Sequence, residues 1–177
     1  TLLRSPLFCC YALNMSFAAM MFFSFLAGAP YIMVELLQRS PAEYGLYFIP
    51  ASLCYMVGNF IAGRLSKRLG IQRMLLMSST LAVIATTLLL SLALSDILTP
   101  WAIFGPMMLV AVSNGMNLPN ATSGAISVKP KMIGAASGLS GFMQIAMGAF
   151  ATFLVGWLQD DSQWPMVIVM FVSSLLA

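Results

Sequence analysis

Three asparagines recur at every third position of one apolar stretch, as Asn114, Asn117 and Asn120. Amide groups are costly in an apolar medium unless they are partnered, so such clusters usually face a bundle interior or a watery cavity. Pro119 leaves the carbonyl of Gly115 without its usual donor, which would break a helix locally. Such a helix could line the path of a ligand, or it could be a structural kink with interhelical hydrogen bonds. Asn114 is the stronger candidate for binding because it lies deepest in the stretch.

A fourth amide, Asn14, shares a helical face with large apolar side chains near the start of the chain. At about 100° per residue, the positions close to the line through Asn14 are Ala18, Met21, Phe25, Gly28 and Ile32. This face would suit an adaptable apolar pocket with one hydrogen-bonding group. The alternative is helix packing, with Asn14 bonded to a neighbouring helix. Pro30 would kink this helix near its far end.

Small residues three and four positions apart fill the stretch after residue 133, and one strip of it carries Ser137, Gly141, Gln144 and Gly148. This spacing lets helix backbones approach closely, so it favours packing over ligand binding. Gln144 is the member of the strip whose side chain could hold a ligand.

The composition places these residues in a membrane. Of the 177 residues, 60% are hydrophobic and 7% are charged, whereas soluble domains carry about 25% charged and about 45–50% apolar residues. A soluble enzyme is therefore excluded. The chain has no histidine, so we expect no metal centre, no cofactor and no imidazole chemistry, and a hydrolytic serine would have no base. The three cysteines cannot form a disulfide framework.

The charged residues divide the chain into long neutral stretches. The first five can each supply the ~20 apolar residues that a membrane helix needs. The third neutral stretch holds nothing more polar than Ser or Thr, and its helix is expected to face lipid. The sixth neutral stretch is too short to cross the membrane. We therefore expect a piece of a larger polytopic protein, with polypeptide missing at both ends. The predicted fold for residues 1–177 is an all-α six-helix membrane bundle, with helices at approximately 8–34, 44–63, 74–95, 101–126, 134–157 and 165–177.

The sign of the charges alternates from one gap to the next. One set of gaps carries Arg4, then Arg64, Lys67, Arg68 and Arg73, then Lys129 and Lys131; the other carries Glu35, Arg39 and Glu43, then Asp96, then Asp160 and Asp161. Seven of the eight bases thus lie on one side and all five acids on the other. Because Lys and Arg in short loops stay inside, both ends of the segment are predicted to face the cytoplasm, in the cytoplasmic (inner) membrane.

The basic gap between the second and third helices resembles a known motif. Gly63, Leu65, Arg68, Gly70 and Arg73 match the Gly-x-Leu-x-Asp-Arg-x-Gly-Arg-Lys loop of the major facilitator superfamily, in the copy between the eighth and ninth helices. Lys67 stands where the motif has its acid.

Three further segments resemble the Bcr/CflA drug-resistance transporters of that superfamily. They are 25–48, which is similar to the seventh helix and its exit, 114–122, similar to the tenth helix, and 134–144, similar to the eleventh. The resemblance implies that this chain is the C-terminal half, helices 7–12, of a twelve-helix transporter. It also implies that the first and fourth helices of this half line a central cavity.

These features together predict a secondary transporter that exports small amphipathic compounds or drugs by alternating access, in exchange for protons. The expected substrate-binding residues are Asn14, Met21, Phe25, Asn114 and Gln144, and Pro30 and Pro119 are the expected gating kinks. The expected partners are the substrate, protons, membrane lipid and the N-terminal six-helix half, with no nucleic acid. No neutral stretch carries an ionisable acid or base, so the proton-coupling residue is expected in the missing half.

Two other functions remain open at this stage. One is an exporter of a polar metabolite such as a sugar or an amino acid, although this half offers only amides for such a substrate. The other is a channel or a non-transporting membrane subunit, which proton-gradient-dependent flux would exclude.

Overall fold

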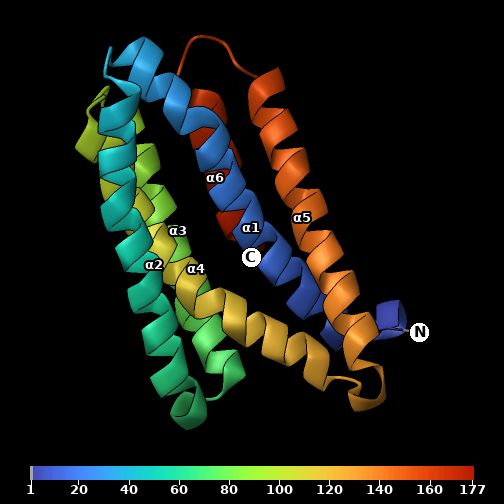
Figure 1. Ribbon diagram of the computed structural model, residues 1–177. Helices are drawn as coiled ribbons and strands as arrows, with labels where there is room; N and C mark the ends of the chain where they lie inside the picture. The colour runs from blue at the N-terminus through green and yellow to red at the C-terminus, as the bar shows by residue number, and fades with distance from the viewer. Residues whose placement is uncertain (1) are drawn as a thin grey trace.

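Helices build the whole of the described chain. The computed structural model describes residues 2–177, and within them it contains six α-helices and no strand. Their bounds are α1 Pro6–Tyr31, α2 Pro41–Leu69, α3 Ile71–Leu94, α4 Pro100–Ser127, α5 Ile133–Trp157 and α6 Trp164–Leu176 (Figure 1). A π-helical turn, Ile32–Leu36, prolongs α1, and short 3-10 turns precede α1 and α5. The predicted all-α, six-helix fold is confirmed.

Helices α2 and α4 each begin with a side-chain cap followed by a proline. Ser40 Oγ accepts a hydrogen bond from the Glu43 backbone N–H at 3.2 Å, and Pro41 occupies the first position of α2. Thr99 Oγ1 accepts from the Ala102 N–H at 3.2 Å at the start of α4, which also begins with a proline. A proline loses nothing there, because the first helical N–H groups have no partner within the helix.

Four segments are long and apolar enough to cross a membrane: Pro6–Leu36, Pro41–Leu69, Ile71–Leu94 and Pro130–Trp157. With 28 residues α4 has sufficient length for a crossing, but its asparagines and glycines lower its mean hydropathy. Helix α6 is a shorter apolar helix of 13 residues. The chain is an integral membrane protein.

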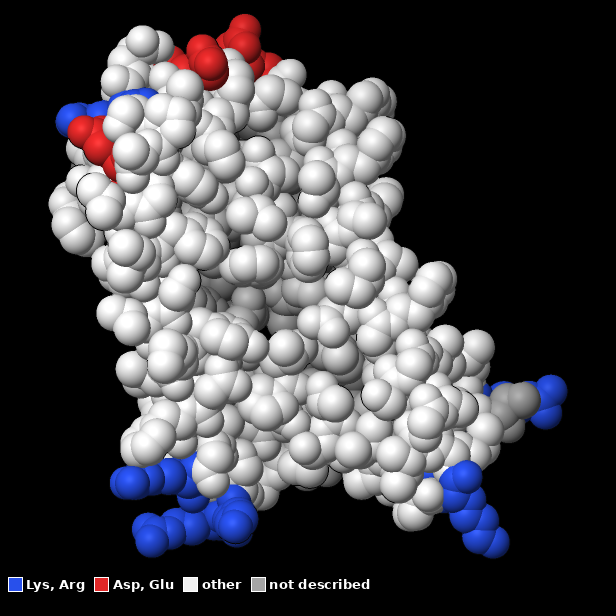
Figure 2. All heavy atoms as spheres, in the orientation of Figure 1, with Lys and Arg blue, Asp and Glu red and all other residues white. Residues whose placement is uncertain are grey.

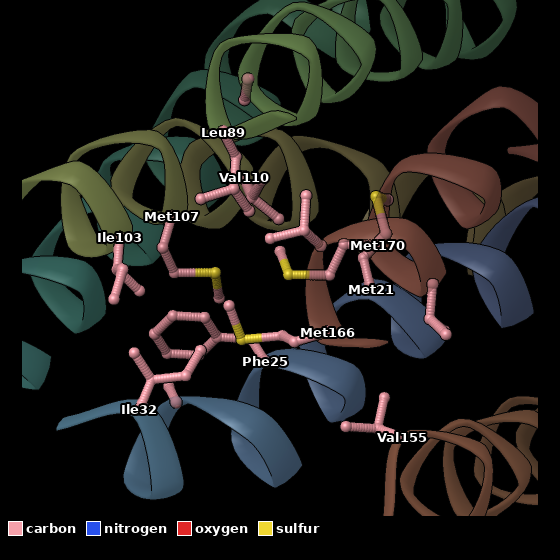
Figure 3. Packing of buried hydrophobic residues seen from close by; sticks show 14 of the residues in the cluster. Met21, Phe25, Ile32, Leu89, Ile103, Met107, Val110, Val155, Met166 and Met170 are labelled. Atoms are coloured by element: carbon pink, nitrogen blue, oxygen red, sulfur yellow. The ribbon is translucent and has the colours of Figure 1, made fainter. Parts of the chain in front are cut away.

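The helices α1 and α4 lie at the centre of the arrangement. Helix α1 packs against α4, α5 and α6, and α4 packs against α1, α2 and α3 (Figure 1). The largest core cluster fills the space between α1, α3, α4 and α6. Six of its buried residues are methionines, and Figure 3 shows Met107 and Met166 beside the ring of Phe25, with Met21 and Met170 further from it. Flexible thioether side chains fill such irregular gaps well.

Helices α2 and α4 cross with their backbones in contact at two glycines. A Cβ on Gly58 would lie 2.2 Å from the Val112 carbonyl oxygen, and one on Gly115 would lie 2.3 Å from the Tyr55 carbonyl oxygen. Both distances are far below van der Waals contact, so only glycine fits at either position.

The basic motif between residues 63 and 73 is almost entirely helical, which differs from the predicted loop. Helix α2 continues past Gly63 to Leu69, and α3 begins at Ile71. Gly70 alone joins them, at φ 81°, a backbone region that favours glycine. Arginine and lysine are good helix formers, and Arg68 in the last turn also complements the helix dipole, so the charges extend the helix.

The charges separate to opposite ends of the bundle. Figure 2 shows the acidic side chains at one end, together with one basic group, and the remaining basic side chains at the other. The basic group at the acidic end is Arg39, which pairs with Glu43 at 4.0 Å. Between the two ends lies a wide uncharged band.

Candidate functional site

A cavity of about 470 Å³ lies between α1, α2, α4 and α5, near the middle of the uncharged band. It opens on the face that Figure 2 shows, where the surface is hollowed. The lining residues are Ala18, Ala19, Phe22, Phe23, Phe48, Ala51, Ser52, Tyr55, Met56, Met107, Ala111, Asn114, Leu118 and Gln144. The volume and the mainly apolar wall fit a small organic molecule.

Polar side chains are few on this wall. Asn114 is 9% exposed, and its Nδ2 donates to the Ala18 carbonyl oxygen of α1 at 3.3 Å. Its Oδ1 is buried and has no hydrogen-bond partner within residues 2–177. Ser52 Oγ donates to the Phe48 carbonyl oxygen of its own helix at 3.1 Å. Tyr55 and Gln144 supply the other polar groups.

None of the lining residues carries a charge. An apolar wall with aromatic rings and a few amide and hydroxyl groups suits amphipathic ligands, since dispersion and apolar burial supply affinity and the polar groups fix orientation. The wall offers no acid or base that could take part in proton transfer.

A separate polar network lies inside the bundle, next to the cavity. Asn117 Nδ2 of α4 donates to Asn14 Oδ1 of α1 at 2.8 Å, and it lies 3.4 Å from Ser78 Oγ of α3. Asn14 Nδ2 donates in turn to Ser79 Oγ at 3.3 Å and to the backbone oxygen of Ala177. The network therefore connects α1, α3, α4 and the end of α6.

The sequence pattern that defines the Major Facilitator Superfamily matches residues 2–177 of the chain. The chain belongs to the major facilitator superfamily (MFS). It is similar to an uncharacterized MFS-type transporter, YdgK, of Bacillus subtilis (strain 168), with 26% identity over 183 residues that cover 99% of this chain and 43% of that protein. An uncharacterized transporter of Rickettsia bellii (strain RML369-C) is 26% identical over 163 residues, which cover 87% of this chain and 40% of that protein. This MFS chain thus spans less than half the length of these curated relatives.

The five predicted binding residues of this MFS chain separate into three groups. Asn114 and Gln144 line the cavity. Asn14 lies outside the lining and takes part in the interhelical network. Met21 and Phe25 are fully buried in the core and also lie outside the lining, with Phe25 packed edge-to-face on Phe104.

The cavity borders the side of α1 that lies next to the predicted face, about one residue further round the helix. It presents Ala18, Ala19, Phe22 and Phe23. Helix α2 contributes a further wall, on which Phe48, Ser52 and Tyr55 line the cavity; none of these three is among the predicted binding residues. The signal was available, because these three residues recur at helical spacing on one face and combine aromatic with hydroxyl groups.

The predicted kink residues both lie inside helices. Pro30 lies in α1 just before the change from α-helical to π-helical turns at Ile32–Leu36. Pro119 lies in α4, which continues to Ser127. Figure 1 shows α4 changing direction part-way along its length. Pro30 thus adjoins a local irregularity of its helix, and the helix that changes direction, α4, carries two internal prolines, Pro106 and Pro119.

The glycines of α5 differ in whether they allow a close contact with another helix. Gly148 faces α1, and a Cβ there would lie 2.5 Å from the Phe23 ring. Gly134, Gly138 and Gly141 have open space where a Cβ would stand. Close packing by the small-residue strip is therefore restricted, within the described chain, to Gly148.

Proposed function

We propose that this chain forms the C-terminal six-helix half of a drug-resistance exporter of the Bcr/CflA type, which moves small amphipathic compounds out of the cell in exchange for protons. The observation that carries the proposal is the uncharged, largely apolar cavity between α1, α2, α4 and α5. Membership of a transporter superfamily agrees with it. Transport would proceed by alternating access, in which two halves rock about a site in the middle of the membrane.

The substrate would bind against Asn114 and Gln144, with the α2 face of Ser52 and Tyr55 opposite. Met21 and Phe25 would support the wall from behind rather than contact the substrate. Proton coupling needs an ionisable group inside the membrane, and no acid or base lines the cavity. The coupling residue would therefore belong to the N-terminal half of the complete transporter.

Transport by the complete protein in liposomes tests this function directly. An amphipathic cationic dye and a radiolabelled sugar or amino acid are offered separately, with and without a pH gradient. Saturable dye movement that collapses when the gradient is removed is expected. Movement of the polar metabolite instead would establish the alternative substrate class, and gradient-independent, non-saturable flux would exclude a transporter.

Asn114→Ala is expected to raise the half-saturating dye concentration about two- to thirteenfold, because one buried hydrogen bond contributes about 0.5–1.5 kcal/mol. Gln144→Ala should act in the same direction. Asn120→Ala is the matched control, since Asn120 is also buried on α4 but bonds to the Met116 carbonyl oxygen of its own helix at 2.7 Å. The measurement is concentration-dependent dye transport at equal protein content. Equal effects of Asn114→Ala and Asn120→Ala would contradict the assignment of Asn114 to the substrate wall.

We also propose that the basic end of the bundle faces the cytoplasm, because short loops rich in Lys and Arg remain inside. Single cysteines at Lys67 and Asp160, in a background without the three native cysteines, test this orientation. A membrane-impermeant thiol reagent added to intact cells should label Asp160→Cys and not Lys67→Cys. The reverse pattern would contradict the orientation, and labelling of both positions from one side would contradict the six-helix topology itself.

A further inference from the structure

Four exposed cations gather where α2 passes into α3. Arg64, Lys67 and Arg68 lie in the last two turns of α2, and Arg73 lies in the first turn of α3. The single-residue connection at Gly70 keeps the two helix ends together. Figure 2 shows this group as the basic cluster at the lower left, below the end of α2 in Figure 1.

The cluster has no counter-charge of its own. All five acids of the chain lie at the opposite end of the bundle. Arg39, which pairs with Glu43, also lies at that opposite end. Four like charges within ten residues of sequence repel one another, so an external anion would lower their free energy.

The helix dipoles account for only part of the cluster. Lys67 and Arg68 lie in the last turn of α2, where cations are favourable. Arg73 lies in the first turn of α3, where a cation is unfavourable, and that turn contains no acid. An external negative charge would offset this unfavourable interaction at Arg73.

Exposed apolar side chains adjoin the cations on the side toward the membrane centre. The Arg64 guanidinium carbon lies 4.4 Å from the centroid of the Phe60 ring, which is itself exposed. On α3 the exposed Leu76 and Met77 lie within about one turn of Arg73. The cations thus lie at the level where the apolar membrane surface ends, the depth of lipid headgroups.

We propose that Arg64, Lys67, Arg68 and Arg73 form a binding site for the phosphate headgroup of an anionic phospholipid. The acyl chains of that lipid would lie along the exposed faces of Phe60, Leu76 and Met77. Free phosphate would meet the cations but not the apolar side chains, so the phospholipid fits the whole surface. Binding at this site is independent of the proposed transport function.

Lipid binding to the complete protein by native mass spectrometry in detergent tests the site. The probes are phosphatidylglycerol, zwitterionic phosphatidylcholine and inorganic phosphate. Each cation near an anionic surface contributes about fivefold in affinity. The double variant Arg68→Gln/Arg73→Gln should therefore bind phosphatidylglycerol about 25-fold more weakly, with phosphatidylcholine binding unchanged.

The matched control is Arg4→Gln/Lys131→Gln. It removes two cations from the same end of the bundle, but outside the cluster, before α1 and between α4 and α5. This control should change phosphatidylglycerol binding by less than about threefold. The charge-preserving variant Arg68→Lys/Arg73→Lys should retain most of the binding, which provides a second readout if the neutral variant does not fold.

Three outcomes would overturn the proposal. The first is equal weakening by the two neutralised pairs, which would indicate a general effect of net charge. The second is equal binding of phosphatidylglycerol and phosphatidylcholine by the unmodified protein. The third is displacement of bound phosphatidylglycerol by millimolar inorganic phosphate, which would assign the cluster to a soluble anion.

Discussion

Gly115→Ala should destabilise the protein more than any other single-methyl change in α4. The added Cβ would lie 2.3 Å from the Tyr55 carbonyl oxygen and 2.9 Å from the Asn59 backbone nitrogen, both on α2. Backbone atoms of a helix cannot rotate away as a side chain can, so α2 and α4 must move apart. Overpacking of this kind costs about 1–3 kcal/mol, which corresponds to a fall on the order of 5 °C in the unfolding temperature.

The chain offers a matched control for this change. Gly105 lies in the same helix, and a Cβ there would meet nothing within 4 Å. Gly105→Ala should leave the unfolding temperature unchanged or raise it, because alanine is the better helix former by about 1 kcal/mol. The measurement is the temperature at which the detergent-solubilised complete protein loses its monodisperse peak. Equal stability of the two variants would contradict the observed helix crossing.

Gly58 provides a further test of the same contact, because a Cβ there would lie 2.2 Å from the Val112 carbonyl oxygen. Once one alanine has separated the helices, the second has less to displace. The double variant Gly58→Ala/Gly115→Ala should therefore lose less stability than the sum of the single losses. Additive losses would indicate two independent clashes rather than one crossing.

The crossing also fixes two walls of the cavity relative to each other. Tyr55 lines the cavity from α2, and Asn114 and Ala111 line it from α4, next to the two glycines. Separation of the helices would widen the cavity as well as weaken the fold. Dye transport by Gly115→Ala is accordingly expected to fall even at temperatures where the protein remains folded.

Because ions are excluded from lipid, the sequence could predict the helices and the separation of acidic and basic residues to opposite ends of the bundle. That single effect determines where neutral stretches begin and end. The prediction was less accurate at the basic motif, where α2 continues to Leu69. The charges of Arg64, Lys67 and Arg68 predict a loop, but long charged residues are good helix formers and need only project beyond the apolar band.

The orientation of each helix about its axis could not be predicted. In a soluble protein the polar face of a helix identifies its exposed side. Helix α1 has no such face, because its few polar residues are spread among apolar ones, and it meets an apolar core on one side and a cavity on another. The pattern through Met21 and Phe25 was therefore as compatible with the core as with the cavity. The structure places Met21 and Phe25 in the core and the neighbouring Phe22 and Phe23 at the cavity.

The hydrogen-bond partners of the buried polar groups could not be predicted from the sequence either. It indicated that the asparagines needed partners but not which atoms would supply them. Helix α3 was expected to face lipid, yet Ser113 Oγ donates to the Ser78 carbonyl oxygen at 2.7 Å, and Thr86 and Ser174 hydroxyls lie 2.7 Å apart. Single hydroxyls on an apolar helix are too common to reveal such contacts before the helices are placed.

Asn117→Leu is expected to lower the stability of the protein, because it leaves a buried hydrogen-bond acceptor on another helix unpaired. Asn117 is 2% exposed and supplies the hydrogen that Asn14 Oδ1 accepts at 2.8 Å. Leucine is similar in length and apolar, so the variant mainly removes this donor. An acceptor left unpaired costs about 1–3 kcal/mol, and hydrogen bonds between membrane helices are worth about 0.6–2 kcal/mol. We expect a loss of about 1–2 kcal/mol, measured as a lower unfolding temperature.

Asn120→Leu is the control, because Asn120 is 3% exposed on the same helix and, within residues 2–177, its Nδ2 donates to the Met116 carbonyl oxygen of α4 itself. Its removal leaves no side chain on another helix unpaired, so a smaller loss is expected. The decisive variant is Asn14→Leu/Asn117→Leu. Replacement of both partners removes the unpaired acceptor together with its donor, so the double variant should be more stable than the sum of the single losses predicts, by about 1 kcal/mol. Additive losses would show that Asn117 and Asn14 act separately, and the network would then not join α1 to α4.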